Sequence, residues 1–175
     1  MIDFLSLRIA QGIKKGAPDS TVSIAVMKYA LSIIINASMI ISLSLLFSIF
    51  TGKTVEVAIA LVAFPLLRQV SGGYHMQSGL KCIVFSTILI TAISLANFGY
   101  WTIVTLGIVS FILVALFAPS KIERQSRIPR KFYPFLKVVS LIIVSTNFLL
   151  VSSVLSATFF AQGISLIHMK GGDNK

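Results

Sequence analysis

Long apolar runs without charge dominate the chain. Tyr29 to Gly52, Cys82 to Ser120 and Val138 to Met169 contain no Asp, Glu, Lys or Arg. A membrane-spanning helix needs ~20 apolar residues, so the first and third runs each predict one helix and the second predicts two. In lipid, the backbone N–H and C=O groups must form their hydrogen bonds within the segment, which favours helices. The apolar residues are continuous rather than alternating, which argues against a transmembrane barrel.

The runs predict an all-α fold, a polytopic membrane helical bundle of about five spans within a range of four to six. The chain is expected to form a single integral membrane domain, 1–175, with candidate spans at 29–50, 54–69, 82–98, 100–118 and 138–160. The second is the weakest, because Glu56 and Arg68 bracket an apolar core of only ~16 Å, so a re-entrant segment is an alternative. The last run is long enough to turn back on itself.

An amphipathic segment precedes the first span. Ile2, Leu5, Ile9 and Ile13 recur at spacings of three and four residues. This pattern predicts a helix lying on the membrane surface, within an interfacial segment at 1–28. A solvated terminal helix is the alternative.

The net charge of +10 suggests an orientation. The basic residues of the chain flank its apolar runs. This placement suggests that the positive charge sets the membrane topology and binds anionic lipid, rather than nucleic acid. A cytoplasmic N-terminus places most basic residues inside, including a basic loop at 119–137, and leaves three outside: Lys53, Lys170 and Lys175. The positive-inside rule therefore predicts a multi-pass cell-membrane protein with its N-terminus and the 68–82 loop in the cytoplasm.

That loop carries the candidate chemistry. It holds the only cysteine of the chain, Cys82, seven residues after His75. On a continuous helix their Cα atoms would be ~10.5 Å apart along the axis, too far for a hydrogen bond between the side chains. Gly72 and Gly73 permit a chain break before them, and Ser78 can cap a new helix starting near Gly79.

In this arrangement Cys82 lies in the first turn of the third span. The positive end of the helix dipole, with Arg68 and Lys81 nearby in sequence, favours a thiolate, and His75 could fold back to accept the thiol proton. These residues alone leave the alternative that Cys82 is a core residue and His75 an interfacial anchor. Two ligands do not make a metal site, so we expect neither a metal nor a cofactor.

The motif Arg68-x-x-x-Gly-Gly-Tyr-His75, followed by Cys82, resembles the signature of the accessory gene regulator B (AgrB) family. Ala118-Pro119 before the basic loop is also similar to that family, as are the length and the hydropathy. The resemblance implies a membrane cysteine endopeptidase that cleaves a short amphipathic signal-peptide precursor (AgrD-like) for quorum sensing, acting as a homodimer. The alternative from the residues alone is a non-catalytic small membrane transporter or sensor subunit.

The resemblance also implies roles for residues. Cys82 matches the family nucleophile and His75 the family base. An acyl-enzyme on Cys82 would then be displaced by a thiol or hydroxyl of the peptide, closing a thiolactone or lactone ring. We expect Arg68, Gly72, Gly73, Ser78 and Lys81 to bind substrate or orient the loop. Backbone N–H groups at Gly72-Gly73 or at the start of the third span are the candidate oxyanion donors.

Overall fold

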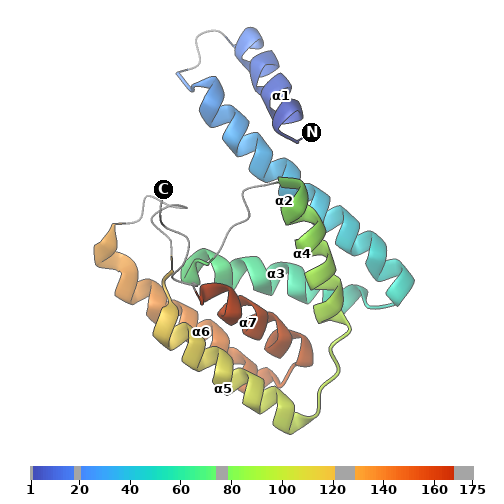
Figure 1. Ribbon diagram of the computed structural model, residues 1–175, viewed down its shortest axis with the longest axis vertical. Coiled ribbons are helices and arrows are strands. Elements are labelled where there is room, and N and C mark those ends of the chain that lie inside the picture. Colours follow the sequence, from blue (N-terminus) through green and yellow to red (C-terminus); the bar gives the residue numbers. More distant parts are fainter. Residues whose placement is uncertain (1, 18–20, 74–78, 121–128, 168–175) are drawn as a thin grey trace. The chain divides into compact units, whose positions relative to one another are not determined.

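The computed structural model describes residues 2–17, 21–73, 79–120 and 129–167, and its regular structure is helical. In chain order (Figure 1) the helices are α1 (Ile2–Gly16), α2 (Ile24–Thr51), α3 (Thr54–Ser71), α4 (Gly79–Ser94), α5 (Tyr100–Phe117), the 3-10 turn η2 (Arg130–Phe132), α6 (Tyr133–Leu150) and α7 (Ser153–Leu166). The predicted all-α class is confirmed.

Four helical stretches in the described residues are long and apolar enough to cross a membrane. They are α2, α3, α5 and the continuous stretch Arg130–Leu150 formed by η2 and α6. The apolar helices α4 and α7 are shorter, with 16 and 14 residues. Helix α3, the weakest prediction, is an 18-residue helix that continues through Pro65. The chain is therefore a multi-pass helical membrane protein, as the apolar runs predicted.

The expectation of one helix from 138 to 160 is wrong. Helix α6 ends at Leu150, Val151 adopts a left-handed backbone with φ 49°, and α7 begins at Ser153. Asn147 stabilises the reversal, because its Oδ1 accepts from the Ser152 N–H (3.0 Å) and its Nδ2 donates to Ser156 Oγ (2.6 Å). Counting charge-free residues misses such a break, because the groups that make it are polar but uncharged.

We predict that Asn147→Leu destabilises the protein by about 1–3 kcal/mol, because the change leaves buried polar groups at the reversal without partners. Unfolding of the purified chain in detergent micelles measures the difference. Thr146→Val is the matched control, since Thr146 is exposed and donates only to the Ile143 carbonyl of its own helix. Equal stability of the Asn147 variant and the wild type would contradict this account of the reversal.

Residues 1–52 and 75–91 form one compact unit. In it α1 packs along α2, burying Ser6 and Ala10 and pairing Asp3 with Lys28 at 3.3 Å. Three residues of the apolar stripe of α1, Leu5, Ile9 and Ile13, stay exposed, whereas Ile2 is half-buried. An amphipathic helix at 2–16 is thus confirmed, and its placement on the membrane surface stays a prediction.

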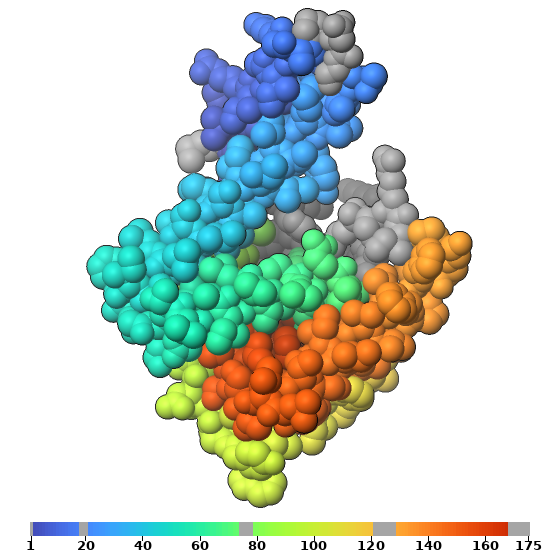
Figure 2. Space-filling view, turned by 180° about the vertical axis from the view of Figure 1, so that it is seen from behind, coloured from blue at the N-terminus to red at the C-terminus, as the bar shows by residue number. Residues whose placement is uncertain are grey.

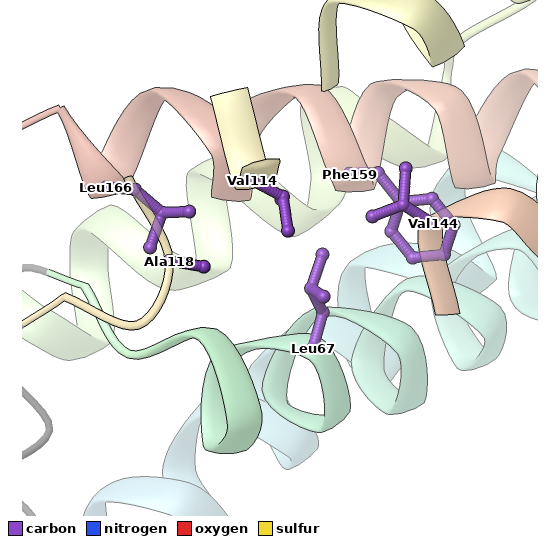
Figure 3. Packing of buried hydrophobic residues seen from close by; sticks show 6 residues of the cluster. All are labelled: Leu67, Val114, Ala118, Val144, Phe159 and Leu166. Atoms are coloured by element: carbon purple, nitrogen blue, oxygen red, sulfur yellow. The ribbon is translucent and has the colours of Figure 1, made fainter. Parts of the chain in front are cut away.

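Residues 53–74 and 92–175 form the second unit, built from α3, α5, α6 and α7. Its apolar core is the cluster drawn in Figure 3: Leu67, Val114, Ala118, Val144, Phe159 and Leu166. Leu67, Ala118 and Leu166 come from the C-terminal ends of α3, α5 and α7. Those three ends therefore meet at one end of the unit.

The second unit is apolar outside and partly polar inside. Trp101 and Leu149 are 79% and 87% exposed, whereas Ser110, Ser140, Thr158 and Gln162 are fully buried. A groove of about 710 Å³, lined almost wholly by apolar atoms, runs between α3, α6 and α7 on the face in Figure 2. Small polar residues between helices and apolar residues outside are the arrangement expected of a bundle in lipid.

Candidate active site

The C-terminal end of α3 leads into the motif through two glycines. The Gly72 N–H donates to the Arg68 carbonyl at 2.9 Å and ends the helix. Gly72 and Gly73 have φ angles of 75° and 127°, values that residues with a side chain rarely adopt. The predicted chain break at these glycines is confirmed.

The segment after α5 pairs with this break. The peptide bond between Ala118 and Pro119 is cis. Beyond it, the Gly73 N–H donates to the Ser120 carbonyl and the Ser120 N–H donates to the Ser71 carbonyl, each at 2.9 Å. This short parallel bridge joins the two stretches of sequence that resemble the family, residues 71–73 and 118–120.

A buried amide from α7 completes the arrangement. Gln162 Nε2 donates to the Gly72 carbonyl at 2.7 Å and to Ser71 Oγ at 3.1 Å. Ser71, Gly72, Gly73, Ser120 and Gln162 form what we call the loop clamp. The clamp fixes where the chain leaves α3 on its way to His75.

The clamp corrects one expectation about the oxyanion site. The N–H groups of Gly72 and Gly73 already donate to the carbonyls of Arg68 and Ser120. They are therefore not available as oxyanion donors in this conformation. The first turn of α4, whose N–H groups have no partner within their own helix, remains the candidate.

Cys82 lies in the first turn of α4, as expected from a helix starting near Gly79. Its side chain is half-buried, and its Sγ is 3.9 Å from Ser86 Oγ, one turn along the helix. Lys81 beside it is exposed. His75 and Ser78 lie outside the described residues, so the imidazole and the predicted helix cap stay predictions.

Arg68 is in the last turn of α3, with its guanidinium carbon 5.9 Å from the centre of the Phe64 ring. It belongs to the second unit with Gly72 and Gly73, whereas Lys81 and Cys82 belong to the first. The geometry thus unites Gly72 and Gly73 with Ser120 and Gln162, partners that were not expected from the sequence.

Asn36 of α2 lies against the start of the cysteine-bearing helix. Its Oδ1 is 3.1 Å from the position that a Cβ on Gly79 would occupy. That oxygen is buried and accepts no hydrogen bond in the described part of the chain. Asn36, Ser120 and Gln162 were all missed as site residues. The sequence did contain a signal for Asn36 and Gln162, because each is a carboxamide inside an apolar run. Polar groups are costly within a membrane, so such residues usually mark a functional site or a contact between helices.

Comparison with known proteins agrees with the motif. The chain matches the family described as Accessory gene regulator B over residues 6–169. The chain belongs to this family.

An AgrB-like protein from Halalkalibacterium halodurans is 27% identical over 122 residues, which cover 68% of the chain and 61% of that protein. The match thus spans less than two thirds of the relative. No solved structure matches the chain significantly. Membership of the AgrB family assigns the protein to the accessory gene regulator system of quorum sensing.

Proposed function

We propose that the protein is a membrane cysteine endopeptidase that cleaves a short amphipathic AgrD-like precursor, with Cys82 as nucleophile and His75 as base. The observation that carries the proposal is the AgrB family match over 6–169, which includes both residues. The position of Cys82 supports it, because the sulfur-bearing residue lies in the first turn of α4, where N–H groups without a partner in their own helix can donate to an oxyanion. The Cys82 side chain is only half-buried.

The proposed reaction has two acyl transfers. His75 takes the thiol proton, and the Cys82 sulfur adds to the scissile carbonyl of the precursor. The C–N bond then breaks, His75 gives the proton to the leaving amine, and the N-terminal fragment remains as a thioester on Cys82. A thiol or hydroxyl of the fragment attacks this thioester, releases the Cys82 sulfur and closes a thiolactone or lactone ring. Exclusion of water from the site favours ring closure over hydrolysis.

The precursor would meet the enzyme at the inner membrane surface. The basic loop at 119–137 offers six cations to an acidic peptide tail: Lys121, Arg124, Arg127, Arg130, Lys131 and Lys137. Such exposed charges mainly steer encounter. The clamp connects this loop to the end of α3, since Ser120, the second residue of the loop, bonds to residues 71 and 73. The family resemblance supports a homodimer as the working form.

The reversal after α6 strengthens the proposed orientation. It returns the end of α7 to the ends of α3 and α5, because Leu166 packs with Leu67 and Ala118. A chain that puts residues 72–73 on the cytoplasmic side thus puts residue 167 there as well. Of the basic residues in the described part of the chain, Lys53 alone is then expected outside. This distribution fits the positive-inside rule better than the five-span arrangement does.

The test is co-expression of the chain with a candidate precursor, followed by mass analysis of the peptides. We expect the wild type to yield a cyclic product and the Cys82→Ala variant to yield intact precursor. A thioester between Cys82 and the peptide, trapped by acid quenching, would identify the acyl-enzyme. Formation of the same product by Cys82→Ala would favour the non-catalytic transporter or sensor subunit instead.

Arg68→Lys tests whether the guanidinium has a role beyond its charge. Lysine keeps the charge but loses the planar fork that binds a carboxylate through two bonds. We expect the rate of precursor cleavage to fall by about tenfold, which corresponds to one lost charge-assisted hydrogen bond. Arg8→Lys is the matched control and should keep the wild-type rate, since Arg8 is exposed and also lies over a phenylalanine ring, that of Phe4. An unchanged cleavage rate in Arg68→Lys would rule out the two-bond role.

A further inference from the structure

A carboxamide of α2 lies beside the start of the cysteine-bearing helix. Asn36 is near the middle of α2 and Gly79 is the first residue of α4, and the two helices lie side by side at this point (Figure 1). A Cβ on Gly79 would stand 3.1 Å from Asn36 Oδ1 and 3.3 Å from Asn36 Nδ2. Both residues belong to the first compact unit, as does Cys82. The contact thus lies wholly within one unit.

Cys82 lies on the side of α4 that carries this contact. The Cβ position of Gly79 points at Asn36, and residues three apart on a helix are neighbours on its surface, with ~5–6 Å between their Cβ atoms. Cys82 is three residues after Gly79, and Ile83, four residues after it, is buried. The carboxamide and the thiol therefore border the same face of α4, about one helical turn apart.

The oxygen of this carboxamide is buried without a hydrogen-bond donor. Ser44 Oγ and Thr87 Oγ1 are also buried without a partner. A hydroxyl can donate to a carbonyl of its own helix after rotation about one bond, as Ser140 does. A carboxamide oxygen needs an N–H group instead, and inside a helix the backbone N–H groups are already used. The missing donor for Asn36 must therefore come from outside α2.

Two sources could supply that donor. The first is the opening turn of α4, whose N–H groups have no partner within their own helix, but none of them bonds to Asn36 Oδ1 in the described part of the chain. The second is a molecule bound beside the helix start. Ile2 shares this space, since its Cδ1 is 3.2 Å from the same Cβ position on Gly79. Displacing the end of this one flexible, half-buried side chain would open the space to such a molecule.

The surroundings limit the chemistry of the missing partner. A neutral acceptor among apolar groups favours a neutral N–H group and disfavours an anion. Asn36 is seven residues into the charge-free run that begins at Tyr29, about 10 Å along the helix. A peptide backbone that reaches this level loses the water that bonds its N–H and C=O groups, so it needs partners from the protein. A carboxamide offers both an acceptor and donors, which match the two polar groups of a peptide bond.

From this geometry we propose that Asn36 is a substrate-binding residue, whose Oδ1 accepts a backbone N–H of the precursor and holds that peptide group beside Cys82. The inference rests on the proposed function, because it gives a substrate contact to the site whose nucleophile is Cys82. It predicts that Cys82 reacts faster with a reagent that carries an amide N–H than with an equivalent reagent that lacks one. Asn36 should be the cause of the difference.

The experiment compares two small neutral thiol reagents, N-methyl iodoacetamide and methyl iodoacetate. They are close in size and shape, because an oxygen in the ester replaces the N–H of the amide, and in both reactions the thiolate displaces iodide. The full chain is used in lipid vesicles, and Cys82 is its only cysteine, so the label reports on one site. The measured quantity is the alkylation rate with the amide divided by the rate with the ester, normalised to the same ratio for free glutathione.

We expect the wild type to prefer the amide by about three- to tenfold over glutathione, the effect of a single hydrogen bond. Asn36→Leu keeps the approximate size but has no acceptor, so it should lose this preference while its rate with the ester stays close to that of the wild type. Gly79→Ala should weaken the preference as well, because its Cβ would displace the carboxamide. Asn97→Leu is the matched control and should keep the wild-type ratio, since Asn97 is exposed in the turn between α4 and α5.

Failure of the inference differs from failure of the proposed function. A wild-type ratio no higher than that of glutathione, or an unchanged ratio in Asn36→Leu, would overturn the binding role. Equal losses of rate with both reagents would assign Asn36 to the fold at the start of α4 and would also overturn it. If Asn36→Leu does not fold, Gly79→Ala decides, since alanine favours a helix, and loss of the fold in both would assign the pair to helix packing. Precursor cleavage that survives Cys82→Ala would instead overturn the proposed function itself.

Discussion

Cys82→Ala is expected to lower precursor cleavage by about 10³-fold or more, because it removes the nucleophile on which both acyl transfers depend. His75→Ala should lower it by about 10²–10⁴-fold, the usual contribution of a positioned general base. The two effects should not add in the double variant, since the residues act as one unit. Mass analysis of precursor and product in vesicles at several time points measures each rate.

The control for this pair is Ser86→Ala. Ser86 Oγ is 3.9 Å from Cys82 Sγ, so the change alters the surroundings of the sulfur without touching the proposed chemistry. Its cleavage rate should stay within a few-fold of the wild type. Retention of helical content and of membrane insertion in every variant separates loss of chemistry from loss of fold. A Cys82→Ala protein that still forms cyclic product at the wild-type rate would end the proposed mechanism.

Gly73→Ala is expected to be the most damaging small substitution in the loop clamp. Its added Cβ would lie 2.9 Å from Ser165 Oγ and 3.3 Å from Gln162 Nε2, and the φ of 127° is strained for any residue with a side chain. We expect a loss of about 1–3 kcal/mol in the free energy of unfolding and at least tenfold slower cleavage. Unfolding in detergent micelles and the cleavage assay measure the two effects.

Two further variants show which part of the effect is steric. In a Ser165→Ala background the nearest contact is absent, so Gly73→Ala should lose less stability there, with the backbone strain remaining. Gly99→Ala is the matched control, because Gly99 lies in the same unit with φ −68° and open space where its Cβ would stand. Wild-type stability and activity in Gly73→Ala would show that the clamp is not the functional conformation.

The agreement between sequence and structure has a physical basis. The apolar runs predicted the helices because, in a bilayer, every backbone polar group must form a hydrogen bond within its own helix. The length of each run then limits how many spans it can form. The end of α3 was expected because Gly72 and Gly73 permit a chain break just before His75, and the start of α4 near Gly79 was expected because Ser78 can cap a helix there. The partners of those glycines did not follow, because Ser120 and Gln162 are distant along the chain and reach them only through packing.

The sequence by itself determined that this is a helical membrane protein of the AgrB type, with Cys82 at the start of a helix and two glycines before His75. These properties depend on local composition and spacing, which a linear pattern contains. Only the tertiary structure decided that the last apolar run reverses at Val151, that Gly72 and Gly73 donate their N–H groups to Arg68 and Ser120, and that Gln162 fixes this turn. The bonds of the glycine turn to Ser120 and Gln162 join segments far apart in the chain, and such bonds form only where folding brings a donor and an acceptor into contact. The bond to Arg68 and the reversal at Val151 are local, but they depend on backbone angles and on the partners of the Asn147 side chain, which composition and spacing do not specify.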